Sequence, residues 1–131
     1  MIVRELEKLS VVLGSSGSGK TYYTSEQLQA NSKLMKCIVI TGNDHYQEYQ
    51  QIATREATKD IIHYVCGGSM SIFEVLRMID FSRFDFVVVE DQHLSEVEAR
   101  FLATIITSRY RAEGILVMQD YAEEWYKNFD C

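Results

Sequence analysis

Apolar residues along this chain gather in short runs, and longer amphipathic or polar stretches separate them. Because the runs are rich in β-branched residues and several end at glycine, they predict five buried strands. These strands are expected at 9–13, 37–41, 61–65, 84–89 and 115–118. Helices are expected from Lys20, at 44–54, from Ser71, from Ser95 and at 121–129. Strands that alternate with helices at this spacing predict a three-layer α/β/α fold with a mostly parallel central sheet.

Individual segments sharpen this prediction. The run at 84–89 ends in three valines, which is typical of a strand covered by helices on both faces. The run at 61–65 mixes polar residues with apolar ones and is expected at the edge of the sheet. Two serine-glutamate pairs have the spacing of a helix capping box, and they are Ser71 with Glu74 and Ser95 with Glu98. The second helix should bury an apolar stripe made of Leu94, Val97, Phe101 and Ile105.

Composition narrows the class of protein. The chain has 131 residues, enough for one domain, with 47% hydrophobic and 24% charged residues. No window approaches the roughly 18 apolar residues of a membrane span, and acidic residues stand near the N-terminus where a signal peptide would be apolar. We therefore expect a cytoplasmic protein without a membrane partner. The three cysteines form no paired motif and are expected to be reduced thiols.

One loop carries specific chemistry. The segment Gly14-Ser15-Ser16-Gly17-Ser18-Gly19-Lys20-Thr21 matches the phosphate-binding pattern of glycine, four residues, glycine, lysine and serine or threonine. Its glycines let backbone N–H groups approach phosphates, Lys20 reaches the terminal phosphates, and the Thr21 hydroxyl suits Mg²⁺. The loop lies between a predicted strand and a predicted helix, as the motif requires. We therefore expect ATP and Mg²⁺ to bind here.

Two adjacent acids follow the valine-rich strand. A phosphate loop needs a carboxylate that holds Mg²⁺ and a group that orients or deprotonates water, and Glu90 and Asp91 supply both. The segment looks like a Walker B element, in which the first acid usually serves the metal and the second polarises water. The usual order is aspartate then glutamate, and here it is reversed. The sequence therefore leaves open which acid has which role.

Three residues near the last predicted strand are further candidates for catalysis. Gln119 follows the strand at 115–118 and would lie near the γ-phosphate if that strand runs between the phosphate-loop strand and the acidic strand. Arg109 and Arg111 precede the strand. Either arginine would suit the charge of a transition state in a neighbouring subunit, or a polynucleotide. The alternative is an ordinary basic helix C-terminus.

Together, the phosphate loop, the Val-Val-Val-Glu-Asp strand and the segment Ser-Arg-Tyr-Arg-Ala-Glu-Gly-Ile-Leu-Val-Met-Gln resemble the additional-strand catalytic-glutamate (ASCE) division of P-loop ATPases. The last segment is most similar to the FtsK/HerA class, which includes the small genome-packaging ATPases of viruses. The resemblance implies a P-loop NTPase fold and a homo-oligomeric ring that threads DNA. It also implies a capsid or portal component as a partner, and residence in the host cytoplasm or virion.

Net charge sets a condition on the motor interpretation. The formal charge of −6 excludes a surface that is basic all over, so any DNA contact must be local. A ring multiplies a few contacts by its subunit number, and the candidates for its pore are Lys33, Lys36, Arg55 and Lys59.

Two other functions use the same loop. A small-molecule kinase would place Arg109 and Arg111 in a closing lid, although the paired acids are more typical of water activation. In a nucleotide-gated interaction module, Glu90 and Asp91 would be too altered for turnover. The sequence contains no Asn-Lys-x-Asp segment for reading guanine, which favours ATP over GTP.

Overall fold

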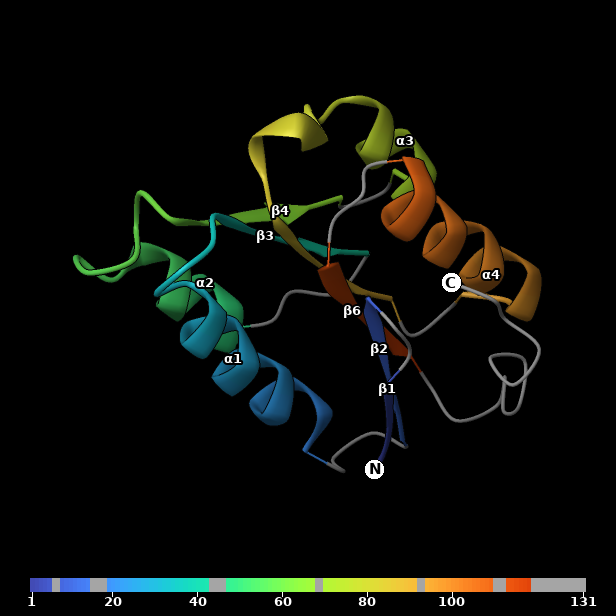
Figure 1. Cartoon of the computed structure of the whole chain (residues 1–131), viewed down its shortest axis with the longest axis horizontal. Helices are drawn as coiled ribbons and strands as arrows, with labels where there is room; N and C mark the ends of the chain where they lie inside the picture. The colour runs from blue at the N-terminus through green and yellow to red at the C-terminus, as the bar shows by residue number, and fades with distance from the viewer. Residues whose placement is uncertain are drawn as a thin grey trace.

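The computed structural model contains one six-stranded sheet in the order β1-β2-β6-β5-β3-β4 (Figure 1). It describes residues 1–5, 8–14, 19–42, 47–67, 70–91, 94–109 and 113–118. The strands are β1 (Ile2–Glu5), β2 (Leu9–Leu13), β3 (Cys37–Thr41), β4 (Ile62–Cys66), β5 (Phe86–Glu90) and β6 (Glu113–Met118). Strands β2 to β6 pair in parallel, and β1 pairs antiparallel with β2. The described helices are α1 (Lys20–Asn31), α2 (Gln47–Thr54), α3 (Ile72–Arg77) and α4 (Glu96–Thr104).

The helices form a layer on each face of the sheet, α1 and α2 on one face and α3 and α4 on the other (Figure 1). Because side chains alternate along a strand, β5 contributes to both hydrophobic cores. Val87 and Val89 pack in the core that contains Val75 of α3. Val88 packs in the core that contains Leu28 of α1. The predicted α/β architecture with a mostly parallel central sheet is confirmed.

The sequence prediction omitted one strand. Strand β1 has half-buried Ile2 and Val3 followed by exposed Arg4 and Glu5, so it lacks the long apolar run that marked the others. Its single hydrogen-bonded neighbour is β2. Strand β4 lies at the other edge of the sheet, which confirms the prediction from its polar residues. The predicted closing helix at 121–129 lies outside the described residues.

Both predicted capping serines begin a helix. The Ser71 hydroxyl accepts a hydrogen bond from the backbone N–H of Glu74 at 3.2 Å. Ser95 and Glu98 form the complete reciprocal box, in which the Glu98 N–H donates to Ser95 Oγ at 3.2 Å and the Ser95 N–H donates to Glu98 Oε1 at 3.0 Å. These bonds satisfy backbone donors that have no partner within the helix.

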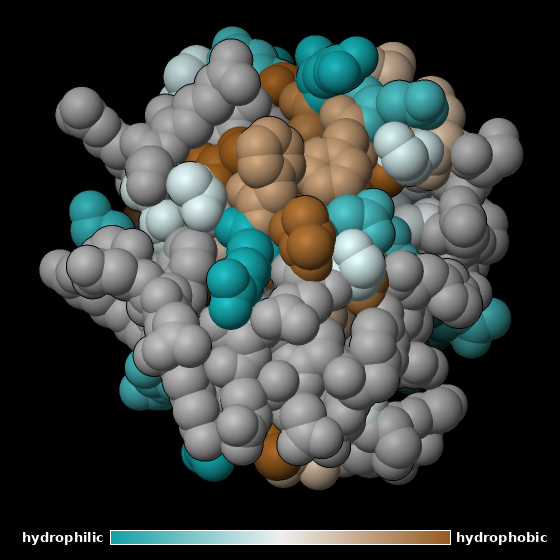
Figure 2. Space-filling model, turned by 90° about the vertical axis from the view of Figure 1, so that its right-hand side faces the viewer, coloured by the Kyte–Doolittle hydropathy of each residue, from teal (hydrophilic) through white to brown (hydrophobic). Residues whose placement is uncertain are grey.

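Helix α4 buries a different face from the one predicted. Val97 is 76% exposed and Phe101 is 57% exposed, so the predicted stripe is wrong at these two positions. The helix buries Ala99, Leu102 and Ala103 instead, and Ile106 of the turn that follows continues this face. Their 3–4 spacing is also helical. Phe101 packs on Phe73 of α3, and apolar side chains gather on this side of the molecule (Figure 2).

The turn that follows α4 is wider than an α-helical turn. Residues Ile105–Arg109 form a π-helical segment, η2, which leads toward β6. π-helical turns are rare and often occur next to functional sites. Segment η2 therefore brings the chain from α4 to the arginine-containing connection that the sequence singled out.

Among the described helices, none has the length and apolar character needed to cross a membrane.

His63 on β4 gives a pH prediction. Its imidazole packs edge-on against Phe84, with ring centroids 5.1 Å apart, and its buried Nε2 has no hydrogen-bond partner among the described residues. Burial first, and then the positive charges of Lys36 and Arg83, lower the pKa of His63, while Asp60 opposes them. The unfolded chain therefore binds the proton more tightly than the folded chain. Stability should be full above pH 6.5, the ordinary histidine pKa, and should fall as the pH drops below it.

The measurement is the free energy of unfolding from urea titrations between pH 5 and 7.5. His63→Phe keeps the packing against Phe84 and removes the titration, so its stability should depend less steeply on pH than that of the wild type. Equal pH dependence in the two proteins would contradict the prediction, because carboxylates common to both would then account for all of it.

Candidate functional site

The described ends of the phosphate loop lie at the carboxyl edge of the sheet. Gly14 follows the buried strand β2, and Gly19 caps α1. Gly19 has φ of 91°, in the left-handed region that glycine adopts without steric cost. The N-cap residue Gly19 has no side chain, so it offers no side-chain acceptor to the backbone N–H groups of the first turn of α1. Ser15, Ser16, Gly17 and Ser18 lie outside the described residues.

Lys20 turns back into the loop. It is 5% exposed, and its Nζ donates a hydrogen bond to the carbonyl oxygen of Gly14. A buried ammonium is costly unless oxygen atoms surround it. The interaction therefore places a positive charge between the two ends of the phosphate loop, which is where the sequence motif requires it.

Glu90 ends β5 and is fully buried. Two hydroxyl groups from different helices donate to its carboxylate. Thr21 Oγ1, in the first turn of α1, lies 3.1 Å from Oε2 and 3.4 Å from Oε1. Tyr49 Oη, on α2, lies 2.6 Å from Oε1. Hydrogen bonds to a charged acceptor are short and strong, and they offset the cost of burying the carboxylate.

Strand alternation explains why Glu90, and not Asp91, lies against Thr21. Glu90 has the same parity as Phe86 and Val88, whose side chains pack in the core under α1 and α2. Because alternate residues of a strand share a face, the Glu90 carboxylate is on the side from which α1 and α2 approach. Glu90 and Asp91 are adjacent in the sequence. The position of α1 determines which of the two carboxylates lies against Thr21.

Asp91 lies one residue beyond β5 and is half-buried. Its backbone N–H donates to the carbonyl oxygen of Val117 on β6 at 3.2 Å, which extends the pairing of β5 and β6. Its side chain lies beside Gly42, at the end of β3. A Cβ atom at Gly42 would be 2.7 Å from Asp91 Oδ2 and 2.8 Å from Cγ. Gly42 therefore leaves the space that this carboxylate uses.

Other candidates are only partly described. Strand β6 lies between β2 and β5, which is the condition on which the prediction for Gln119 depended. Gln119 itself follows Met118 and lies outside the described residues, as does Arg111. The backbone of Arg109 ends η2, and its side chain is not described. The roles predicted for these three residues stay predictions.

The chemistry of Thr21 and Glu90 suits Mg²⁺. A hydroxyl and a carboxylate are oxygen ligands, which this hard cation prefers. Within the described residues, no group of three or more His, Cys, Asp or Glu side chains is placed to hold a metal ion. Mg²⁺ normally takes only one or two protein carboxylates and completes its shell with waters and phosphate oxygens, so these two residues fit it.

Sequence analysis missed Tyr49 and Gly42. Tyr49 is fully buried, although the sequence of α2 is mostly polar. The sequence indication of its burial is the spacing of three residues between Tyr49 and Ile52, the other buried residue of α2. Gly42 directly follows the predicted strand at 37–41, and its spacing shows no relation to Asp91. The pairing of β3 with β5 brings Gly42 to Asp91, and the packing of α2 against the sheet brings Tyr49 to Glu90.

The four basic residues predicted for DNA contact lie at the opposite edge of the sheet. Lys33 and Lys36 follow α1 and precede β3, while Arg55 and Lys59 follow α2 and precede β4. Since β3 and β4 are parallel neighbours, both connections lie at the amino-terminal edge. Two of the four have local partners. Arg55 Nη1 donates to Gln29 Oε1 at 2.7 Å, and Lys59 Nζ lies 3.1 Å from Glu56 Oε1.

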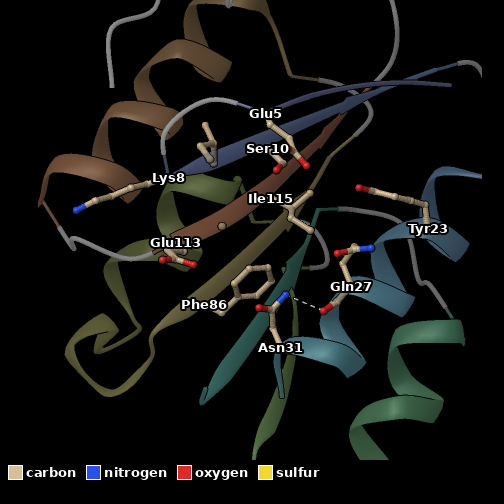
Figure 3. Close-up of a pocket in the computed structure, with 11 residues that line it drawn as sticks. Glu5, Lys8, Ser10, Tyr23, Gln27, Asn31, Phe86, Glu113 and Ile115 are labelled. Atoms are coloured by element: carbon tan, nitrogen blue, oxygen red, sulfur yellow. Dashed lines mark hydrogen bonds between the residues drawn. The ribbon is translucent and has the colours of Figure 1, made fainter. Parts of the chain in front are cut away.

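A cavity of about 260 Å³ lies at this same edge, between α1 and the sheet (Figure 3). Phe86 and Ile115 contribute apolar surface, and Tyr23 and Gln27 approach from α1. The cavity is formed by the amino-terminal ends of β2, β5 and β6, whereas Thr21 and Glu90 meet at the carboxyl ends. It is therefore separate from the candidate nucleotide site.

The cysteines of the described chain show no catalytic geometry. Cys37 is buried in β3, and burial first and then the charge of Asp85 raise the pKa of its thiol to about 12. This thiol is protonated at neutral pH. The Cys66 thiol donates to the Gly42 carbonyl oxygen at 3.5 Å.

Comparisons of the chain with protein-family models, with curated proteins and with solved structures gave no match.

Proposed function

We propose that this protein binds ATP with Mg²⁺ at the carboxyl edge of β2, β6 and β5 and hydrolyses it, as a P-loop NTPase of the ASCE division. One observation carries the proposal. Thr21 and Glu90 are 69 residues apart in the chain, yet their side chains meet at 3.1 Å beside the buried Lys20. A phosphate loop and a Walker B acid require this meeting, because both ligate the same metal ion.

The strand order gives independent support. In the ASCE division, the additional strand runs between the phosphate-loop strand and the strand that bears the acids. Here β6 pairs with β2 on one side and with β5 on the other. The described geometry is therefore compatible with a water-activating site more than with a lid-based kinase, whose paired acids would have no clear use.

The roles of the two acids follow from their surroundings. Glu90 would share Mg²⁺ with Thr21, because their oxygen atoms already lie together in a buried position. Asp91 would orient or deprotonate the attacking water, because its half-buried carboxylate lies at the strand end outside the Thr21 contact. This assignment keeps the usual order of the Walker B element, metal acid first, with the two residue types exchanged.

Each group of the candidate site would have its own chemical role. Lys20 would stabilise negative charge on the terminal phosphates, and the N–H groups at the start of α1 would bind their oxygens. Asp91 would hold the water in line with the γ-phosphorus and accept its proton. When bound, Mg²⁺ would neutralise charge between the β- and γ-phosphates.

The more specific proposal is a ring-forming DNA motor of the FtsK/HerA type. It rests on the resemblance of the arginine-containing segment to that class and on the basic residues at the amino-terminal edge of β3 and β4. A ring would repeat those few positive charges around its pore, which suits a protomer with a net charge of −6. Its partners would be DNA and a capsid or portal component.

Phosphate release from Mg-ATP tests the proposal. The rate should be measurable for the wild type and should be lost in Lys20→Ala, because the variant lacks the charge that holds the terminal phosphates. Lys8→Ala is the matched control, since this exposed lysine precedes β2 at the other edge of the sheet. Absence of both ATP binding and phosphate release in the folded wild type would reject the proposal.

Two further measurements separate the motor, the kinase and the nucleotide-gated module. They are phosphate release in the presence of duplex or single-stranded DNA, and the particle mass in solution. DNA-stimulated release by a multi-subunit particle supports the motor. Transfer of phosphate to a small acceptor, without an effect of DNA, supports a kinase. Binding of ATP without release supports a nucleotide-gated module.

A further inference from the structure

The end of β3 and helix α2 each supply a residue to one acid of the candidate site. Gly42, directly after β3, leaves space for the Asp91 carboxylate, and its N–H donates to the Glu90 carbonyl oxygen at 3.1 Å. Tyr49, on α2, donates to Glu90 Oε1 at 2.6 Å. Neither residue belongs to the phosphate loop or to the acidic strand.

We propose that Tyr49 and Gly42 are positioning residues, which fix the Glu90 carboxylate toward Thr21 and leave room for Asp91 beside it. The inference rests on the proposed ATPase function and deepens it. It makes α2 and the end of β3 a third structural unit of the site, in addition to the phosphate loop and the acidic strand.

The hydrogen bond from Tyr49 fixes the rotation of the Glu90 side chain. A glutamate side chain has three rotatable bonds, and each hydrogen bond to its carboxylate reduces the number of orientations that it can adopt. Tyr49 and Thr21 belong to different helices, and each hydroxyl lies closest to a different oxygen of the Glu90 carboxylate. If Thr21 ligated Mg²⁺, the Tyr49 hydroxyl would still hold Glu90 in place.

Burial makes this contact a strong positioning device. Tyr49 and Glu90 are each 0% exposed, so no bulk water competes for the hydrogen bond. Groups that orient a metal-binding residue typically change metal affinity or activity by about 10- to 100-fold when they are removed. An effect of this size is therefore expected for the hydroxyl alone.

The test compares Tyr49→Phe with Tyr64→Phe. Tyr64 is the matched control because its hydroxyl lies 3.2 Å from Thr41 Oγ1, a neutral group, on the neighbouring strands. Tyr49→Phe should lower kcat by about 10- to 100-fold with little change in KM for ATP. It should also raise the Mg²⁺ concentration needed for half-maximal binding of a fluorescent ATP analogue. Tyr64→Phe should leave kcat and the Mg²⁺ requirement of binding unchanged.

Gly42→Ala tests the second acid in a variant that keeps Tyr49. The added methyl group would meet the end of the Asp91 side chain, which can rotate away. The expected result is a loss of kcat with ATP-analogue binding and its Mg²⁺ dependence preserved, because Glu90 and Thr21 stay in place. Thermal unfolding of all three variants separates loss of positioning from loss of fold.

The outcomes distinguish the two proposals. If the wild type neither binds nor hydrolyses ATP, the proposed function fails. If the wild type hydrolyses ATP but folded Tyr49→Phe and Gly42→Ala match it in kcat and in Mg²⁺ dependence, the positioning inference alone is overturned. Loss of activity in Tyr64→Phe equal to that in Tyr49→Phe would also overturn it, since the loss would then not depend on contact with Glu90.

Discussion

Replacing Glu90 with glutamine should reduce kcat for ATP hydrolysis by about 100-fold or more, the size typical for removal of one electrostatic group from a catalytic site. The amide keeps the shape of the side chain but carries no charge to hold Mg²⁺ with Thr21. Binding of ATP should persist, because Lys20 and the start of α1 are unchanged. Phosphate release and binding of a fluorescent ATP analogue measure the two effects separately.

Stability gives this prediction a second readout. The Glu90 carboxylate is fully buried, and a neutral amide costs less to bury than a charge. Glu90→Gln should therefore unfold at the same temperature as the wild type or higher, which excludes misfolding as the cause of inactivity. Glu74→Gln on α3 serves as the control, since this carboxylate is exposed. A Glu90→Gln protein with wild-type turnover would remove Glu90 from the site.

Gly114→Ala should destabilise the fold by about 3 kcal/mol or more, at or above the upper end of the usual range for overpacking. Gly114 lies on β6 between β2 and β5, opposite Val87 in the register. A Cβ atom there would be 2.4 Å from the Val87 carbonyl oxygen. Backbone inside a sheet cannot turn aside, so two central strands would have to separate. The free energy of unfolding from urea titration measures the cost.

Gly42→Ala is the matched control for this stability effect. It is the same chemical change at another strand end, but its close contact is with the Asp91 side chain. It should cost much less stability than Gly114→Ala, because a side chain moves at a lower cost than backbone. Equal losses in the two variants would show that the added methyl group at Gly114 is accommodated and that the close contact is not limiting.

Local sequence signals predicted most of the elements, for reasons that the structure makes plain. Strands β2, β3 and β5 are buried along nearly their whole length, so each appears as a mostly apolar run. The serines that cap α3 and α4 act through hydrogen bonds within four residues of sequence. Interactions this local can be recognised from spacing alone.

Elements whose character depends on a distant partner were predicted less well. Strand β1 exists because β2 offers it an edge, and its own sequence is only half apolar. The buried face of α4 depends on the sheet that it covers: Ala99, Leu102 and Ala103 are buried, whereas Val97 and Phe101 are exposed. Both sets of residues have helical spacing, so the spacing alone did not determine which set faces the core.

By itself, the sequence determined that a phosphate-binding pattern follows a buried strand, and that two acids end another strand. Only the tertiary structure decided which acid meets Thr21, because that depends on which face of β5 the helix α1 covers. The partnership of Tyr49 with Glu90 across 41 residues is likewise set by packing. Side chains far apart in a chain become neighbours through strand order and layer position, and no short window of sequence contains either.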